Sequence, residues 1–226
     1  MDRYARHKNL FAEGKMEQIQ KARVMVVGAG GLGCTVLQLI ARLGVDTLHV
    51  YDCADVDLPD LNRQILYDEF DIGEKKAICA ARKLRCINPN IQVVAHSDKV
   101  DESTLLPEVD LVFDCLDNFQ TRFILDRLLY PLHIPMIHGG VNKFFAQVTS
   151  IVPGQSKTLA ELFPVDATSI DKQTTKDIFP PVVTITASIQ VSEGVKYLTG
   201  QHSDMLINRV LMIDTLANSF EIIDFN

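Results

Sequence analysis

The stretch VMVVGAGGLG at residues 24–33 decides the fold of this chain. Its first half is an apolar run of strand length, and its second half contains the glycines that permit a tight turn into a helix. A helix over residues 33–43 and a second strand, TLHVYD at residues 47–52, follow. A strand, a glycine turn, a helix and a strand in this order predict a βαβ unit, whose two strands lie parallel in one sheet.

The rest of the chain extends this unit into one α/β domain of residues 1–226. Further strands are expected at residues 91–97, 110–117 and 135–152, and further helices at residues 74–85, 119–133 and 183–200. The polar segment 52–64 is expected to form a loop over the carboxyl edge of the sheet. We therefore predict a Rossmann-like, mostly parallel sheet flanked by helices, continued by antiparallel strands and a C-terminal hairpin.

Two segments fall outside this regular pattern. Residues 1–20 are expected to form a helical arm or, alternatively, a capping strand, with Leu10, Phe11, Met16 and Ile19 facing the body of the protein. Residues 153–180 alternate Gly, Ser, Thr, Asp and Lys among few apolar residues, which indicates a mobile crossover loop over the site.

Composition limits the classes of function. The net charge of −7 argues against a nucleic-acid surface, because neutralising phosphates needs clustered Lys and Arg. The N-terminus lacks the apolar core of a signal peptide, and the apolar runs are too short to cross a membrane. Five cysteines, an odd number, in a chain without a secretory signal are typical of reduced thiols, and the absence of a C-x-x-C pair argues against a structural zinc site. We expect a cytoplasmic protein that binds neither nucleic acid nor membrane.

The glycine turn predicts a nucleotide site. Gly28, Gly30 and Gly33 follow a strand and open a helix, so phosphate oxygens can approach backbone N–H groups at the positive end of the helix. Asp52 ends the second strand, where a carboxylate can accept hydrogen bonds from both ribose hydroxyls. These features alone suit an NAD-dependent dehydrogenase as well as an ATP-binding enzyme.

Two cations favour ATP over NAD. Arg63, between Asn62 and Gln64 on the polar loop, and Lys76, at the start of the next helix, are expected near the edge that carries the glycine turn. Attack of a carboxylate on the α-phosphorus of ATP builds negative charge on the phosphoryl oxygens and on the departing pyrophosphate, which fixed cations stabilise. Hydride transfer has no such need.

Asp117 supplies a candidate magnesium ligand. It ends the fourth predicted strand, directly before Asn118, at the carboxyl edge where open α/β sheets bind ligands. A carboxylate there could hold the Mg²⁺ that accompanies a triphosphate. Each of these charges, taken singly, is more often a solvated surface residue or a helix cap, and only their joint placement on one edge predicts a site.

These residues resemble a known family, the ThiF, MoeB and HesA superfamily of adenylating enzymes related to ubiquitin-activating enzymes. The resemblance covers nearly the whole chain, with several motifs in the family's order. The matching motifs are RYAR (3–6), GAGGLG (28–33), DLNRQ (60–64), GEKK (73–76), INPN (87–90), DCLDN (114–118), HGG (138–140) and SIQVSEGVKYLTG (188–200). The chain thus resembles one ThiF-like adenylation domain.

The resemblance implies roles for individual residues. Arg63 and Lys76 would contact the triphosphate of ATP, Asp52 the ribose, and Asp117 the magnesium ion and the reacting groups. Family members are typically homodimers in which the second arginine of the R-Y-x-R arm reaches the partner's site, and that role would fall to Arg6. Further nucleotide contacts would come from Gly28, Gly30, Gly31, Gly33, Asn62, Gln64 and Asn118.

The chain also departs from the family's pattern. The two C-x-x-C pairs that usually hold zinc are missing, and residues 153–180 contain no cysteine. We therefore expect neither a zinc site nor a covalent thioester, so that the chemistry stops at an acyl-adenylate. Asp60 replaces a common asparagine and would either weaken nucleotide contact or signal an altered site. His138 replaces an aromatic residue and would touch substrate or be structural, while Cys115 is expected in the core.

The sequence leaves two classes of substrate possible for the carboxylate that is adenylated. The absences favour a small-molecule acid, such as the guanylylpyridinol that a zinc-free ThiF-like protein adenylates in Fe-hydrogenase cofactor biosynthesis. The alternative is the C-terminal Gly-Gly of a ubiquitin-like sulfur-carrier protein. Two further hypotheses are a nucleotide-binding scaffold without catalysis and an NAD-dependent oxidoreductase. The presence of Arg63, Lys76 and Asp117 argues against the scaffold.

Overall fold

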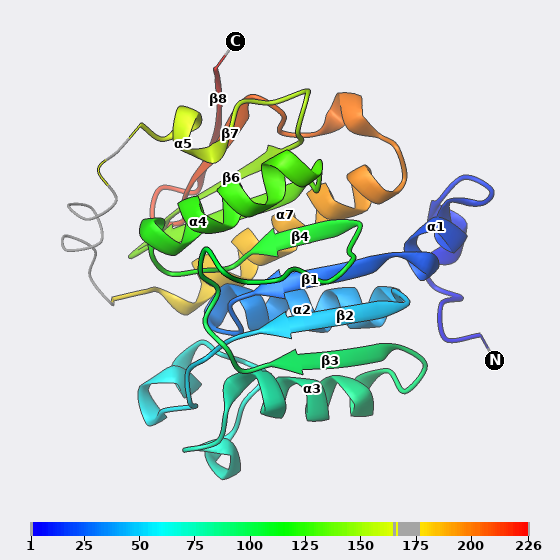
Figure 1. The fold of residues 1–226 in the computed structure, drawn as a ribbon, viewed down its shortest axis with the longest axis vertical. Helices are drawn as coiled ribbons and strands as arrows, with labels where there is room; N and C mark the ends of the chain where they lie inside the picture. The colour runs from blue at the N-terminus through cyan, green and yellow to red at the C-terminus, as the bar shows by residue number, and fades with distance from the viewer. Residues whose placement is uncertain (1, 165, 167–176, 226) are drawn as a thin grey trace.

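The computed structural model describes residues 2–164, 166 and 177–225 and contains an eight-stranded sheet with the order β3-β2-β1-β4-β5-β6-β7-β8 (Figure 1). The first five strands run parallel, and the last three continue the sheet antiparallel, as predicted. The strands are β1 Arg23–Val27, β2 Thr47–Tyr51, β3 Gln92–His96, β4 Leu111–Asp114, β5 Met136–Asn142, β6 Phe145–Ile151, β7 Arg209–Asp214 and β8 Ser219–Asp224.

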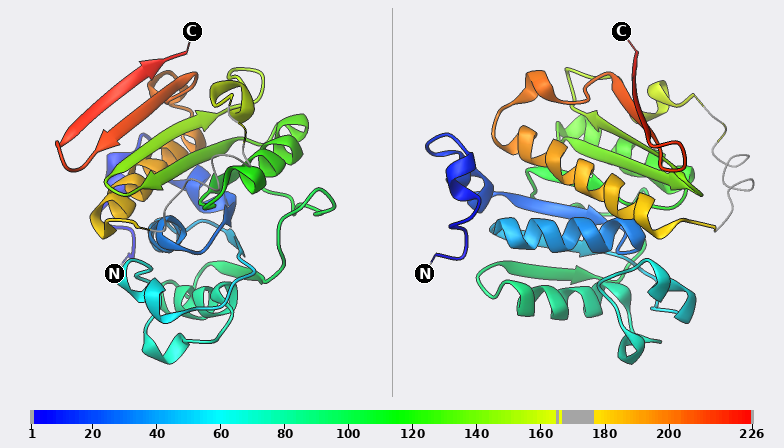
Figure 2. Two further views of the ribbon diagram at one scale, coloured as in Figure 1. Left: turned by 90° about the vertical axis from the view of Figure 1, so that its left-hand side faces the viewer. Right: turned by 180° about the vertical axis from the view of Figure 1, so that it is seen from behind.

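Helices cover both faces of the sheet (Figure 2). One hydrophobic core lies between the sheet and α2 (Gly31–Leu43), α3 (Lys76–Ile87) and α7 (Pro180–Leu198). A second core lies on the opposite face, under α4 (Phe119–Leu129) and α5 (Leu159–Leu162). The remaining described helices are α1 Lys15–Lys21 and the 3₁₀ turns η1 Lys8–Leu10, η2 Leu58–Asn62, η3 Glu69–Asp71, η4 Tyr130–Leu132 and η5 His202–Asp204.

The central strands are apolar throughout because both of their faces are buried. Within β1, Val24 and Val26 belong to the first core, whereas Met25 and Val27 belong to the second. The continuous apolar run at residues 24–27 therefore forms a strand that lies between two layers of helices.

Strand register brings the candidate residues to one edge. Val27 pairs with Tyr51 of β2 on one side and with Asp114 of β4 on the other. Residues 28, 52 and 115 therefore leave the sheet side by side. The chain runs from β1 to β2 and β3 on one side and returns to β4 on the other, so this edge is the topological switch point where open α/β sheets bind ligands.

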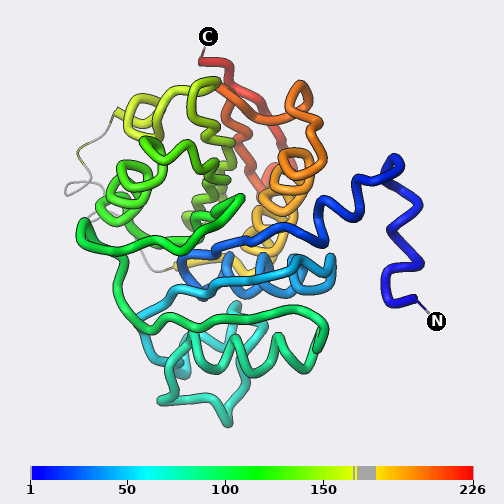
Figure 3. The backbone as a smooth tube through the Cα atoms, turned by 45° about the vertical axis from the view of Figure 1, so that its right-hand side comes forward, coloured from blue at the N-terminus to red at the C-terminus, as the bar shows by residue number. Residues whose placement is uncertain are grey.

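The N-terminal arm lies against the opposite edge of the sheet (Figure 3). The hydroxyl of Tyr4 accepts a hydrogen bond from Nδ2 of Asn88 at 3.1 Å, just beyond the end of α3. The arm is helical only over η1 and α1, with Met16 and Ile19 buried as predicted. The expectation for Leu10 is wrong, because this side chain is 80% exposed.

The segment predicted as one crossover loop contains regular structure. Thr158 and Glu161 form a capping box that starts α5. Near its end, the backbone N–H of Phe179 donates to the carbonyl oxygen of Lys143, so the chain pairs with the β5–β6 turn before entering α7. Residues 165 and 167–176, on which the rest of that expectation falls, lie outside the described residues. None of the described helices is long and apolar enough to cross a membrane.

Asp126 joins the two helices of the second core. It is buried on α4 and accepts a hydrogen bond from the backbone N–H of Leu159 at 2.9 Å, at the start of α5. Burial raises the pKa of this carboxyl to about 6, although the backbone hydrogen bonds from Leu159 and Ala160 act in the opposite direction. The folded protein thus retains a proton that the unfolded chain releases near its ordinary pKa.

We predict that Asp126 lowers stability as the pH rises from about 4 to about 6, because the folded state binds more protons than the unfolded state in this window. Asp126→Asn keeps an acceptor for Leu159 and cannot ionise. Between pH 4 and pH 7, the wild type should lose roughly 2–3 kcal/mol of unfolding free energy relative to the variant. Urea unfolding of both proteins across this range measures the difference, and parallel stability curves would contradict the assignment.

Candidate nucleotide-binding site

The glycine turn between β1 and α2 is packed too tightly for side chains at two positions. Gly28 has φ +95°, and a Cβ there would lie 2.5 Å from the carbonyl oxygen of Cys115. A Cβ on Gly33 would lie 1.8 Å from the carbonyl oxygen of Gly28. At Gly30, by contrast, a Cβ would meet only Nε2 of Gln64 at 3.8 Å. Packing alone therefore accounts for glycine at 28 and 33.

The start of α2 faces the candidate site without a side-chain cap. Gly30 occupies the N-cap position and offers no side-chain acceptor to the first N–H groups of the helix. Such groups carry the partial positive charge of the helix and can receive an anion. Gly31 forms the first residue of α2, where a Cβ would lie 3.0 Å from Cγ1 of Val183 on α7.

Asp52 lies against the glycine turn, directly after β2. Its Oδ2 accepts a hydrogen bond from the backbone N–H of Ala29 at 2.7 Å, and its Oδ1 accepts one from Ala54 at 2.8 Å. Burial raises the pKa of Asp52, whereas the positive charge of Lys76 lowers it and the negative charge of Asp117 raises it further. Lys76 and Asp117 therefore both lie within electrostatic range of this carboxylate, as the sequence predicted.

Arg63 and Lys76 meet on one carboxylate, that of Asp60. Nζ of Lys76 lies 2.8 Å from Oδ2 of Asp60, and Nη2 of Arg63 lies 3.7 Å from Oδ1. Asn62 is exposed and accepts a hydrogen bond from Nη1 of Arg63 at 2.9 Å. The two cations predicted from the sequence thus form one cluster, and Asn62 orients the guanidinium.

Gln64 lies beneath this cluster and is buried. Its Nε2 donates to Oδ1 of Asp60 at 2.6 Å, while its Oε1 has no hydrogen-bond partner among the described residues. A buried carbonyl oxygen normally has a donor, so this oxygen departs from the usual pattern.

Tyr67 is a residue that the sequence analysis missed. Its hydroxyl donates to the carbonyl oxygen of Ala29 at 2.8 Å and lies 3.2 Å from that of Lys76. It thereby ties the glycine turn to the first turn of α3. Its place in the apolar tripeptide Ile65-Leu66-Tyr67, beyond the polar loop, gave no signal of this role.

Asp117 and Asn118 occupy the loop between β4 and α4. Asp117 is exposed, and its Oδ1 accepts a hydrogen bond from Nδ2 of Asn118 at 3.0 Å. Asn118 caps α4, since its Oδ1 accepts from the backbone N–H of Thr121 at 2.8 Å. Asn118 is therefore placed as a helix cap that also orients Asp117.

A buried network holds the Asp117 loop from below. Asp114 accepts hydrogen bonds from the backbone N–H of Leu116 at 3.1 Å and from Nδ1 of His138 at 2.7 Å. Nη2 of Arg122 donates to the carbonyl oxygens of Leu116 and of Gly139. Asp114 and Arg122 were not assigned from the sequence, although they lie three residues before and five residues after Asp117.

His138 lies in the interior, beneath the Asp117 loop. Its side chain is fully buried, and burial lowers its pKa despite the adjacent Asp114. Of the two expected roles for His138, its burial and its bond to Asp114 favour the structural one. Cys115 is also buried, as expected, and burial raises the pKa of its thiol well above the usual range, so it is not a nucleophile.

Arg6 is exposed on the N-terminal arm. Its neighbour Tyr4 lies against Gly44, which caps the end of α2, whereas the glycine turn lies at the start of the same helix. Arg6 and Lys76 are thus at opposite edges of the sheet, and the structure does not bring Arg6 to the site of its own chain.

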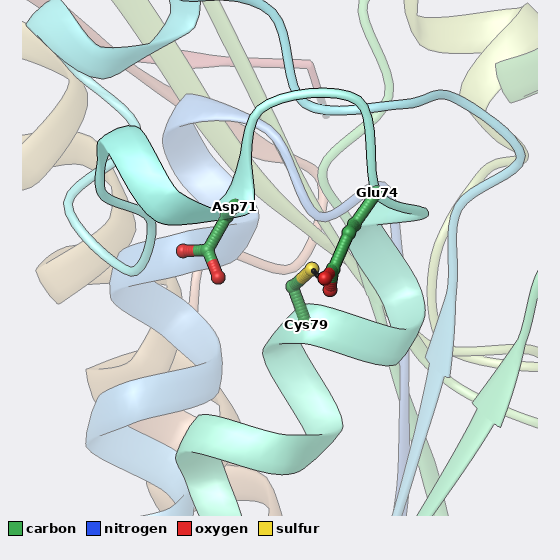
Figure 4. A group of neighbouring side chains, drawn as sticks. All are labelled: Asp71, Glu74 and Cys79. Atoms are coloured by element: carbon green, nitrogen blue, oxygen red, sulfur yellow. Dashed lines mark hydrogen bonds between the residues drawn. The ribbon is translucent and has the colours of Figure 1, made fainter.

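Asp71, Glu74 and Cys79 form a group with the spacing of metal ligands (Figure 4). Cations of the protein already neutralise its acidic members. Asp71 is paired with Arg82 at 2.5 Å and also with Lys83, and Arg82 lies 3.3 Å from Glu74. Burial and the hydrogen bond to Glu74 raise the pKa of Cys79 to about 12, which disfavours the thiolate that a metal requires.

A family model described as the ThiF family matches residues 4–226. The chain belongs to the ThiF family. A SAMP-activating enzyme E1 of Haloferax volcanii is 34% identical over 100% of this chain and 85% of its own length. A sulfur carrier protein adenylyltransferase of Thermus thermophilus is 31% identical over 97% of this chain and 85% of its own length. The resemblance stated from the motifs is thereby confirmed at the level of the family.

Solved structures support the fold. The crystal structure of E. coli MccB with MccA-N7isoASN has a TM-score of 0.90 and covers 100% of this chain and 72% of that chain at 20% identity. The structure of MccB with ATP has a TM-score of 0.83 and covers 94% of this chain and 65% of that chain, also at 20% identity. At this identity the likeness concerns the fold alone.

Proposed function

We propose that this ThiF-family chain is an ATP-dependent adenylyltransferase that activates a carboxylate as an acyl-adenylate and releases pyrophosphate. The observation that carries the proposal is the pair of poorly exposed cations, Arg63 and Lys76, beside the glycine turn at the topological switch point. The activity agrees with the names of the relatives, which include an adenylyltransferase of comparable length.

The site has the charges that a triphosphate needs. Lys76 and Arg63 can stabilise negative charge on the phosphoryl oxygens during attack on the α-phosphorus and on the departing pyrophosphate. Because Lys76 is only 10% exposed, its interaction with a phosphate is screened less than that of a surface lysine. The uncapped start of α2 at Gly30 and Gly31 adds backbone donors for the same anion.

The remaining predicted residues surround this triphosphate position. We assign the ribose to Asp52, which borders the glycine turn, and we assign Gln64 to the support of the cation cluster through its hydrogen bond to Asp60. Asn62 and Asn118 act indirectly, by orienting Arg63 and Asp117. Gly28 and Gly33 shape the turn.

We assign Mg²⁺ to Asp117. The carboxylate is exposed at the carboxyl edge and, within the described part of the chain, Asn118 donates a hydrogen bond to its Oδ1, so a hard cation can reach its oxygens from solvent. Bound there with ATP, the ion would neutralise part of the phosphate charge. We propose no resident zinc, because the chain has no C-x-x-C pair.

For the carboxylate substrate, we propose the C-terminus of a small carrier protein. A related adenylyltransferase is named for its sulfur carrier protein, and this chain spans 85% of that relative. The antiparallel strands beyond β5 also carry large exposed apolar side chains, of the kind that protein partners cover. These side chains are Phe145, Phe220, Ile222 and Ile223.

A small-molecule acid, such as guanylylpyridinol, is the second candidate. The missing cysteine pairs and the cysteine-free segment 153–180 favour it, since neither zinc nor a thioester is needed to adenylate a small acid. Both candidates use the same triphosphate site, so they differ only in what occupies the space beside the α-phosphate.

We further propose a homodimer in which Arg6 completes the partner's site. Arg6 cannot act on its own chain in this structure, because the arm lies against the opposite edge of the sheet. The segment that carries Arg63 and leads into α3 also exposes apolar side chains that a second copy would cover. They are Leu58, Ile65, Phe70, Ile72 and Ile78.

ATP–pyrophosphate exchange in the presence of the cognate carboxylate tests the proposed activity. Arg63→Ala, Lys76→Ala and Asp117→Ala should each reduce exchange by about 100-fold or more, because each removes a group that stabilises charge in the transition state. Lys75→Ala is the matched control, since Lys75 is exposed and paired with the exposed Asp55. Full exchange in the three site variants would refute the assigned roles.

The same assay separates the two substrate classes. Screening candidate Gly-Gly carrier proteins against candidate small acids should give exchange that depends on a carrier, and exchange supported only by a small acid would establish the second candidate instead.

Mixed subunits test the role of Arg6. Arg6→Ala and Lys76→Ala homodimers should each be inactive. Co-refolding an equal mixture should restore about a quarter of wild-type exchange, because half of the dimers are mixed and each carries one intact site. Absence of any recovery, with mixed dimers verified by a tag, would show that Arg6 does not act in trans.

A further inference from the structure

Asp60 sits at the centre of the candidate triphosphate site. Its carboxylate pairs with Lys76 at 2.8 Å and with Arg63 at 3.7 Å. It also accepts hydrogen bonds from Nε2 of Gln64 at 2.6 Å and from the backbone N–H of Asp57 at 3.1 Å. One side chain of the protein thus already holds both cations proposed to bind phosphate.

We propose that Asp60 is an internal counter-ion that takes the place of a phosphate group between Arg63 and Lys76, and that the triphosphate of ATP must displace it. The inference rests on the proposed function and adds a competing anion to it. By this account, Asp60 keeps the cations ordered before the nucleotide arrives and sets a limit on how tightly the nucleotide binds.

The low exposure of the pair supports this competition. The side chains of Lys76 and Asp60 are only 10% and 13% exposed. Taking a charge out of water is costly unless an opposite charge is close by, and Asp60 supplies that charge to Lys76. When a triphosphate arrives, the same carboxylate becomes a like charge beside the phosphate oxygens, so the two anions cannot share the cations without repulsion.

The hydrogen bond that closes the η2 turn does not require a negative charge at position 60. Asp57 is the N-cap of η2, and its own side chain accepts a hydrogen bond from the backbone N–H of Leu58 at 2.8 Å. The return hydrogen bond, from the backbone N–H of Asp57 to Asp60, needs only a neutral side-chain oxygen. An asparagine at position 60 can make that bond. Its amide, however, cannot neutralise Lys76 and Arg63.

The test compares Asp60→Asn with Asp57→Asn in the full chain. Both substitutions remove one negative charge from the same 3₁₀ turn, but Asp57 is exposed and its side chain caps the backbone rather than pairing with the cations. The probes are inorganic tripolyphosphate and adenosine, measured separately by calorimetry. Tripolyphosphate reports on the cations, and adenosine reports on the rest of the site.

Asp60→Asn should bind tripolyphosphate about tenfold more tightly than wild type, which corresponds to about 1.4 kcal/mol. Adenosine binding should stay unchanged, and Asp57→Asn should behave like wild type with both probes. A purely structural effect of position 60 would instead change adenosine binding as well. Asp60→Ser, a second uncharged variant, should bind tripolyphosphate more tightly by a similar factor. It keeps the test valid if Asp60→Asn folds poorly.

The proposal would be overturned if wild type binds tripolyphosphate and both Asp60 variants bind it equally tightly or more weakly. The proposed triphosphate site would still be supported by that result. Weaker binding would mean that Asp60 chiefly positions the cations. If no protein in the series binds tripolyphosphate, the proposed triphosphate site itself fails, and the counter-ion role fails with it.

Discussion

The arrangement of the site depends on one steric constraint, the close contact between Gly33 and the carbonyl oxygen of Gly28. Only glycine lets α2 approach the end of β1 so closely, and this approach fixes where the helix begins. Strand register then places Asp52 beside the turn on one side and the loop with Asp117 on the other. A flexible polar loop alone could not keep Asp52 and the Asp117 loop beside the glycine turn. A parallel sheet with a fixed register does, because it holds the ends of neighbouring strands side by side.

Charge balance is the second determinant of the site. Arg63 and Lys76 are far enough from water that each needs a partner, and Asp60 provides that partner for both. The loop after β4, which carries the negative charge of Asp117, is arranged differently. Asp117 stays exposed, while the buried Asp114, His138 and Arg122 fix the backbone beneath it. Asp60 thus neutralises the two cations, whereas the carboxylate of Asp117 stays exposed.

The sequence predicts the fold well because its signals are local. Apolar runs, the glycine turn and the prolines at the start of α7 each act over a few residues, and the sheet follows from their order. The sequence also places Arg63, Lys76 and Asp117 at one edge. The sequence does not reveal which side chains these residues contact. The Lys76–Asp60 pair and the hydrogen bond from Tyr67 to Ala29 join segments that come together only through tertiary packing. The burial of His138 is hidden for the same reason.

The most direct test of the account is a crystal structure of the protein with Mg²⁺ and a non-hydrolysable ATP analogue. We predict phosphate oxygens within hydrogen-bond distance of Arg63 and Lys76, about 2.7–3.2 Å, and the magnesium ion beside Asp117. The ribose should lie at Asp52, next to the glycine turn. A triphosphate bound away from both cations, or bound while neither touches a phosphate oxygen, would contradict the central claim.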